Sequence, residues 1–165
     1  FKTSSPSMDI SKASNFERFI FDILQNNSDR VRNLWEKLGS EGSFIIDDSD
    51  SVLAIKRSGI VSGCSTHQNR IETIKNIKYK YNRIIDPHTA DGLFVARKNL
   101  KPNIPMVCLE TALPVKFSKT VFESLGENPL APKKFYDLEK KPQKFTKINN
   151  DVQSLKEYIQ ERVQL

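Results

Sequence analysis

Residues 105–117 read Pro-Met-Val-Cys-Leu-Glu-Thr-Ala-Leu-Pro-Val-Lys-Phe, and this stretch indicates the class of fold. Met106 to Leu109 form a short apolar run that is typical of a buried strand. Pro114 suits the first turn of a helix, where its missing N–H costs nothing. The residues between them are therefore expected to turn from a strand into a helix. In open α/β sheets ligands bind beside such turns, which makes Thr111 the first candidate for a ligand contact.

The region before this stretch repeats the pattern. Ile84 and Ile85 are suited to a strand, Asp86 and Pro87 to an N-cap and first helical turn, and a helix is expected over residues 87–100. With the strand at 105–109 and a helix at 114–125, ended by Gly126, the order becomes strand–helix–strand–helix. This order predicts an α/β fold with short parallel strands flanked by helices. Further strands to complete the sheet are not evident in the sequence.

The rest of the chain is helix-rich. Ser14 and Glu17 have the spacing of a capping box at the start of one helix, and a second helix is expected from Ser28 to a terminator at Gly39. A brief helix is expected from residue 49 to about 55. Isoleucines at 71, 74 and 77 mark a longer helix, with Thr66 or Asn69 as its cap. A last helix starts near Asp151, with its apolar residues expected to face inward: Val152, Leu155, Ile159 and Val163.

Composition and charge exclude several classes of protein. A chain of 165 residues is long enough for one domain with a core, although it begins at Phe1 and we expect it to be a piece of a longer protein. The net charge of +6 is scattered without an aromatic stacking platform, which disfavours a nucleic-acid binder. No apolar run approaches a membrane span, and no secretory signal opens the chain. Two cysteines make no disulfide framework, so a cytoplasmic location is expected.

Several side chains have competing explanations. Thr111 precedes a predicted helix, and on spacing alone a helix cap is its better explanation. His88 lies in a first helical turn, where it is equally well explained as a helix-start residue or as an anion contact. Cys64 and His67 could form a nucleophile–base pair, although a polar loop that caps the next helix is favoured. Cys108 could complete a metal site with them, but the spacing matches no zinc pattern, and no metal is expected.

Four stretches together resemble the threonine synthase family, whose members are pyridoxal-phosphate enzymes of fold type II, the tryptophan-synthase-β-like fold. They are Ser-Pro-Ser-Met-Asp-Ile at 5–10 with Ser-Asn-Phe-Glu-Arg-Phe at 14–19, Ser-Gly-Cys-Ser-Thr-His at 62–67, Asp-Pro-His-Thr-Ala-Asp-Gly at 86–92, and Leu-Glu-Thr-Ala-Leu-Pro-Val-Lys-Phe at 109–117. Each is weak alone, but four in order at suitable distances are specific.

The resemblance implies that the chain is the C-terminal portion of such an enzyme. Residues 1–126 would be the C-terminal part of the catalytic domain, and residues 127–165 a surface-lying extension with a terminal helix. The family's Schiff-base lysine and its glycine-rich phosphate loop precede the matching region. We therefore assign no lysine of this chain as catalytic, and expect the N-terminal part of the same enzyme to be the partner and the separate chain to be inactive.

The resemblance also implies a reaction and a site. The substrate is O-phospho-L-homoserine, which γ-elimination and β-replacement convert with water into L-threonine and phosphate, using pyridoxal 5'-phosphate as electron sink. Thr111 matches the position whose hydroxyl bonds the pyridine nitrogen. The candidates for further pocket contacts are Ser5, Ser7, Asp9, Asn15 and His88. Two alternatives remain: another fold type II lyase such as a threonine or serine dehydratase, and a non-catalytic interaction module derived from the enzyme.

Overall fold

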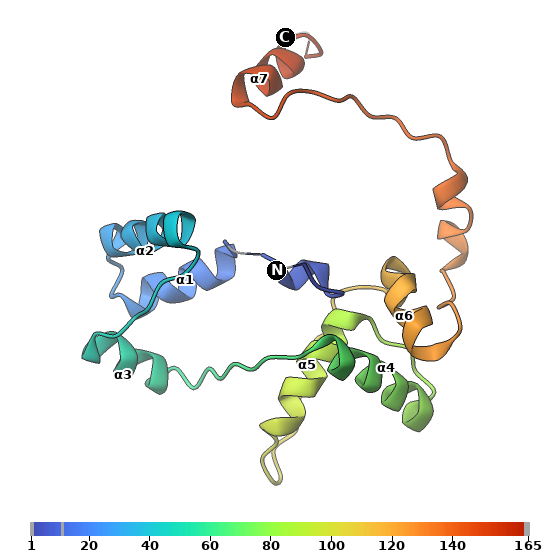
Figure 1. Ribbon diagram of the computed structural model, residues 1–165, viewed down its shortest axis with the longest axis horizontal. Coiled ribbons are helices and arrows are strands. Elements are labelled where there is room, and N and C mark those ends of the chain that lie inside the picture. The colour runs from blue at the N-terminus through green and yellow to red at the C-terminus, as the bar shows by residue number, and fades with distance from the viewer. Residues whose placement is uncertain (1, 11, 164–165) are drawn as a thin grey trace. The chain divides into compact units, whose positions relative to one another are not determined.

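The computed structural model describes residues 2–10 and 12–163, which form two compact units divided between Leu130 and Ala131. Within the described residues every regular element is a helix (Figure 1). The α-helices are α1 Ser14–Ile23, α2 Ser28–Glu41, α3 Ser49–Arg57, α4 His67–Tyr81, α5 Pro87–Lys98, α6 Ser118–Leu125 and α7 Val152–Gln160. Four short 3-10 helices accompany them: η1 Pro6–Met8, η2 Pro114–Phe117, η3 Lys133–Phe135 and η4 Leu138–Lys140.

The two predicted strands are absent from the described chain. Residues 84–86 and 104–113 contain no strand or bridge, and the backbone hydrogen bonds that they make are local, from Ala90 to Asp86, Ile104 to Lys101 and Lys116 to Leu113. The predicted burial of the second stretch is also wrong, because Val107 is 76% and Leu109 is 79% exposed. A strand exists only when a neighbour satisfies its N–H and C=O groups. The described residues supply no such neighbour, so the parallel sheet is not confirmed.

Helices α1 and α2 pack around one apolar cluster, and α3 contacts α1. Ile20, Leu24 and Val31 are buried there, and Trp35 packs against them from α2. Ser14 is the first helical residue of α1 and does not cap it, so the predicted capping box does not form. Helix α2 continues past Gly39 and ends at Gly42, whose φ of 77° is left-handed. A glycine allows the left-handed conformation that ends a helix, but it does not impose that conformation. The presence of Gly39 alone therefore did not end α2.

Helices α4, α5 and α6 form a second cluster, in which α4 packs against both of the others. Ile74, Ile77, Ile85 and Ala90 are buried together, with Leu93 and Leu125 around them. Thr66 caps α4 and forms a capping box with Asn69, so both predicted cap residues contribute. Gly126 ends α6 in the left-handed conformation, as predicted.

The unit that begins at Ala131 has no buried side chain among its described residues. Asp151 caps α7 by accepting the Ser154 N–H at 2.8 Å. The prediction that the apolar residues of α7 face inward is wrong for this chain, because Val152 is 70% and Leu155 is 46% exposed. None of the helices described is both long and apolar enough to cross a membrane.

Candidate functional site

Residues 5–10, 62–67, 86–92 and 109–117, which carry most of the family resemblance, come together near the N-terminal ends of α4 and α5, whereas residues 14–19 lie on α1. Ser4 Oγ lies 2.7 Å from His67 Nδ1, and the Ser7 N–H lies 3.0 Å from His88 Nε2. The His88 ring contacts the Phe117 ring edge-on, with centroids 4.5 Å apart. Segments more than sixty residues apart in sequence are thus brought together by side-chain hydrogen bonds. This convergence defines the candidate site.

Two glycines permit the close approach of these segments. A Cβ on Gly63 would lie 2.9 Å from Val95 Cγ1, closer than carbon atoms approach in proteins. A Cβ on Gly92 would lie 3.2 Å from the Cys108 sulfur. Glycine at 63 therefore lets the segment before α4 lie on α5, and glycine at 92 lets α5 lie on the segment that leads to Thr111.

Asp86 organises the start of α5. Its carboxylate is fully buried, caps the helix by accepting the His88 N–H at 2.9 Å, and also accepts a hydrogen bond from the Thr89 hydroxyl. The same oxygen that accepts the amide lies 2.8 Å from His88 Nδ1. His88 is held on both ring nitrogens, by Asp86 on one side and by the Ser7 amide on the other.

A buried ion pair between Arg70 of α4 and Asp91 of α5 underlies the site. Arg70 Nε donates to both Asp91 oxygens at 2.8 and 2.9 Å, with the two side chains 6% and 11% exposed. The other guanidinium nitrogens donate to Ser4 Oγ at 2.8 Å and to the Ser65 carbonyl at 3.2 Å. Neither Arg70 nor the pairing of Asp91 was predicted from sequence, because a salt bridge between residues 21 positions apart leaves no local pattern.

His67 links three elements and does not activate a thiol. Its Nε2 lies 2.8 Å from Glu123 of α6, and its Nδ1 faces Ser4, whose hydroxyl is oriented by Arg70. Within the described chain, Cys64 is exposed and makes no hydrogen bond to His67, so the predicted alternative of a Cys64–His67 pair does not form. His67 instead joins the N-terminal segment to α4 and α6.

The second cysteine, Cys108, is half-buried beside the site. Burial, followed by the nearby carboxylates of Asp86 and Glu110, raises the pKa of its thiol above the usual value. A thiol with a raised pKa is a poor nucleophile and a poor metal ligand at neutral pH. Cys108 therefore serves here as a small packing residue against Gly92.

The remaining predicted pocket residues differ in their surroundings. Ser5 is fully buried, and its hydroxyl has no hydrogen-bond partner. Asp9 accepts the Thr3 N–H at 2.7 Å and the Thr3 hydroxyl at 2.8 Å, bonds that lower its pKa. Ser7 is exposed and bonds through its backbone. Asn15 lies in the first turn of α1, where it accepts a hydrogen bond from Arg18 and none from the other candidates.

Thr111 is exposed at the turn before η2, and its hydroxyl makes no hydrogen bond within the described chain. The N-cap of η2 is Leu113, with no side-chain cap, so the helix-cap explanation of Thr111 is wrong. Its neighbour Glu110 forms an ion pair with Arg83. The Thr111 hydroxyl is therefore available to a partner outside the described residues.

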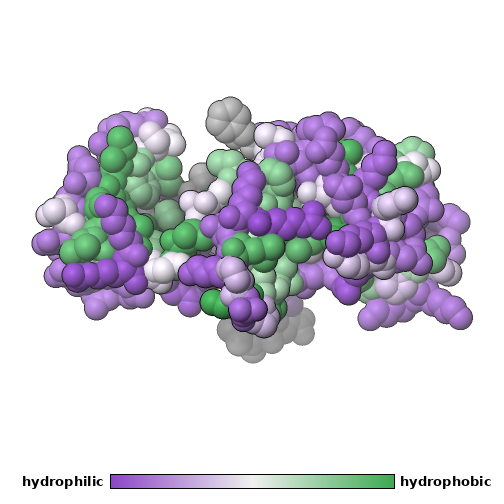
Figure 2. All heavy atoms as spheres, turned by 90° about the horizontal axis from the view of Figure 1, so that it is seen from below, coloured by the Kyte–Doolittle hydropathy of each residue, from purple (hydrophilic) through white to green (hydrophobic). Residues whose placement is uncertain are grey.

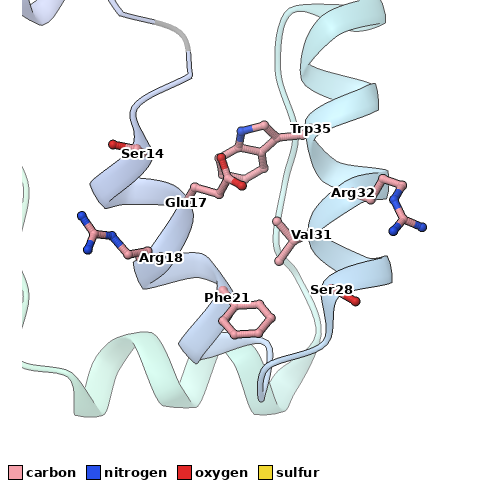
Figure 3. A pocket seen from close by; sticks show the side chains of 8 residues that line it. All are labelled: Ser14, Glu17, Arg18, Phe21, Ser28, Val31, Arg32 and Trp35. Atoms are coloured by element: carbon pink, nitrogen blue, oxygen red, sulfur yellow. The ribbon is translucent and has the colours of Figure 1, made fainter. Parts of the chain in front are cut away.

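A groove of about 680 Å³ lies between α1 and α2, apart from these residues (Figure 3). Glu17 and Trp35 reach toward each other across it, whereas Arg18 and Arg32 point outward. Its lining contains none of the predicted site residues: Ser14, Glu17, Arg18, Phe21, Ser28, Val31, Arg32 and Trp35. The convergence of the motif segments, and not this groove, is the candidate functional site.

Comparisons with known proteins agree with the geometry. Residues 89–159 match the family model described as threonine synthase, C-terminal. The chain is 45% identical over 163 residues to a threonine synthase from Methylobacillus glycogenes, covering 99% of the chain and 34% of that protein. It is 46% identical over 160 residues to one from Corynebacterium glutamicum, covering 96% of the chain and 33% of that protein. The chain thus spans about a third of the length of these relatives.

A crystal structure of PLP-bound threonine synthase from Brucella melitensis has the same fold over this region. The TM-score is 0.82 at 34% identity, covering 100% of this chain and 35% of that one. All of these matches are to enzymes about three times as long as the matched region. It belongs to the threonine synthase family and corresponds to the C-terminal portion of its members.

Proposed function

We propose that the chain is the part of a threonine synthase that contributes one wall of the active site. The complete enzyme would convert O-phospho-L-homoserine and water into L-threonine and phosphate by γ-elimination and β-replacement. Family membership supports the activity, and the convergence of residues 4–9, 86–92 and 108–117 supports the location of the wall. The free Thr111 hydroxyl, exposed at the edge of that convergence, is the observation on which the assignment rests.

The cofactor would be pyridoxal 5'-phosphate, as in the Brucella relative. When bound, it supplies an electron sink for the bonds broken at the substrate's α and β carbons. Thr111 fits a contact to the pyridine nitrogen, because its hydroxyl is unpaired within the described chain and can donate a hydrogen bond to an unprotonated nitrogen. A hydroxyl does not hold that nitrogen protonated as a carboxylate would. Thr111 would thereby orient the ring and set how strongly it withdraws electrons.

The N-terminal segment would complete the wall. Ser5 supports this role, because a fully buried hydroxyl without a partner is costly unless another group satisfies it. Ser7 and Asp9 belong to the same segment, whereas Asn15 lies on α1 and is the weakest of the candidates. The Schiff-base lysine and the cofactor's phosphate loop would come from the N-terminal part of the same enzyme, which makes that part the partner of this chain.

The substitution Thr111→Val in the complete enzyme tests the proposal. We expect turnover to fall by about tenfold, the equivalent of one hydrogen bond of about 1.4 kcal/mol. The free energy of unfolding should change by less than about 0.5 kcal/mol, because the side chain is exposed and unbonded. Steady-state phosphate release and urea unfolding measure the two quantities.

Thr111→Ser is the matched control, because it keeps the hydroxyl and should keep most of the turnover. Unaltered turnover in Thr111→Val would contradict the assigned contact. Release of a 2-oxo acid and ammonia from L-threonine or L-serine, with no phosphate release from O-phospho-L-homoserine, would identify the enzyme as a dehydratase.

A further inference from the structure

We propose that His88 is a positioning residue and not a ligand contact: as its Nδ1–H tautomer it fastens residues 5–9 to the end of the Thr111 turn. The inference rests on the proposed function in one respect: residues 5–9 and the Thr111 turn would line the same active site. The geometry itself is independent of which reaction the site performs.

The tautomer follows from the two partners of the ring. A backbone N–H can only donate, so His88 Nε2, 3.0 Å from the Ser7 nitrogen, must accept and carries no proton. A neutral imidazole then has its single proton on Nδ1. That proton faces Asp86 Oδ1 at 2.8 Å, and a carboxylate is an acceptor. The ring is therefore neutral, with one defined tautomer.

Asp86 holds this arrangement rigidly. Its side chain is fully buried, and it is fixed by the His88 amide and the Thr89 hydroxyl as well as by the ring. The His88 side chain is only 9% exposed. A carboxylate that orients a histidine ring through Nδ1 sets what its Nε2 can bind. Here Nε2 binds the protein's own N-terminal segment.

Neither ring nitrogen of His88 remains for a ligand, because both are bonded within the chain. The ring itself packs in a T-shaped contact with Phe117, the last residue of η2. One side chain thus joins η1, which contains Ser7, to η2, which begins three residues after Thr111. Loss of the Nε2 acceptor should release residues 5–9 while the start of α5 stays intact.

Hydrogen–deuterium exchange of the Ser7 amide in the complete protein tests the inference. His88→Asn keeps a donor at the position of Nδ1 and removes the acceptor at Nε2, whereas His88→Gln places an acceptor oxygen near Nε2. We expect Ser7 exchange to become about threefold to tenfold faster in His88→Asn, the effect of one lost hydrogen bond. His88→Gln should restore most of the protection.

Ser7→Ala is the matched control, because the bond uses the Ser7 backbone and its exchange should stay slow after correction for intrinsic rates. Selective 15N-histidine labelling, assigned with His88→Gln, should give the signature of a neutral ring protonated at Nδ1. Wild-type exchange of Ser7 in His88→Asn would overturn the proposal, as would an Nε2–H ring.

The activity readout separates this proposal from the proposed function. A positioning role predicts that kcat falls in His88→Asn and recovers in His88→Gln along with the Ser7 exchange. Altered affinity for pyridoxal phosphate with Ser7 exchange unchanged would make His88 a ligand contact and overturn the inference. Faster Ser7 exchange with unchanged kcat would support the role of His88 in holding residues 5–9. It would contradict the proposal that residues 5–9 line the active site.

Discussion

The Arg70 guanidinium meets four acceptor atoms from three segments of the chain: both Asp91 oxygens, Ser4 Oγ and the Ser65 carbonyl. The planar fork of arginine matches this set of acceptors, and a lysine would supply only a point charge. Because both partners are nearly buried, removal of either one leaves an uncompensated charge away from water. This pair therefore carries more of the local stability than the surface ion pairs do.

We expect Asp91→Ala to lower the free energy of unfolding by about 3 kcal/mol, because Arg70 would be left buried without its counter-charge. Urea unfolding measures the change. Asp29→Ala is the matched control: Asp29 pairs with Arg32 at 2.9 Å, but the side chains are 79% and 65% exposed, and the cost should stay below about 1 kcal/mol. Equal losses in the two variants would contradict the burial argument.

The raised pKa of Cys108 predicts how its alkylation rate depends on pH. Its pKa is raised by burial and by the carboxylates of Asp86 and Glu110, so less thiolate is present at any given pH than for an ordinary cysteine. In a Cys64→Ser background, alkylation of Cys108 by iodoacetamide should be slower than that of a free thiol, and its rate should rise at higher pH. Glu110→Gln should shift the profile toward lower pH, whereas Glu123→Gln should not.

The site was predictable from sequence only where a residue lies inside a local motif. Thr111 and His88 stand next to a proline-started turn and a helix N-terminus, which are visible in sequence. Arg70 resembles any helix-surface arginine until α5 packs on it, and the His67–Glu123 contact spans 56 residues. The role of His88 was also left open, because its partners, the Ser7 amide and the Phe117 ring, come from remote segments.

At the scale of elements, helices were predictable because their hydrogen bonds are local. Helices α4, α5 and α6 start or end at the expected residues, since caps and periodicity act within one turn. The strands could not be predicted in the same way. An apolar run is only compatible with a strand, and a sheet also needs partner strands, which the described residues lack. The end of α2 shows the same limit, since two glycines were available and only backbone conformation distinguishes them.

These two glycines of α2 allow a matched test. Gly39 lies inside the helix, where an added Cβ would meet only Lys12 Nζ at 3.9 Å, so Gly39→Ala should raise the free energy of unfolding by about 0.5–1 kcal/mol. Gly42 has a φ of 77°, so Gly42→Ala should lower it by about 1 kcal/mol although nothing lies within 4 Å. Thermal or urea unfolding of the two variants should therefore shift in opposite directions. A stabilised Gly42→Ala would place the end of α2 elsewhere.

At the scale of the whole molecule, the chain leaves many apolar side chains at its surface (Figure 2). Leu130 is 89% and Ile45 is 78% exposed, and the face of α7 is also uncovered. The relatives are about three times as long as the matched region. We propose that the remainder of such an enzyme covers these side chains and supplies the opposite wall of the active site.

The separate 165-residue chain is accordingly expected to be inactive. With pyridoxal phosphate and O-phospho-L-homoserine it should release no phosphate above background, because no lysine of the chain is assigned to hold the cofactor. Addition of the N-terminal part of the enzyme should restore release if the two parts associate. Phosphate release by the separate chain, measured with a coupled assay, would disprove this expectation.

Residues 105–109 also govern how the separate chain behaves at high concentration. They are apolar and belong to no regular element, and their backbone N–H and C=O groups are unpaired within the described chain. Such a segment is a template for edge-to-edge pairing between copies, and stacked copies become cross-β fibrils. Pro105, the first residue of the segment, and Glu110, directly after it, act as gatekeepers against this outcome. The same five residues that the sequence predicts to be a strand are thus the aggregation-prone segment of the chain on its own.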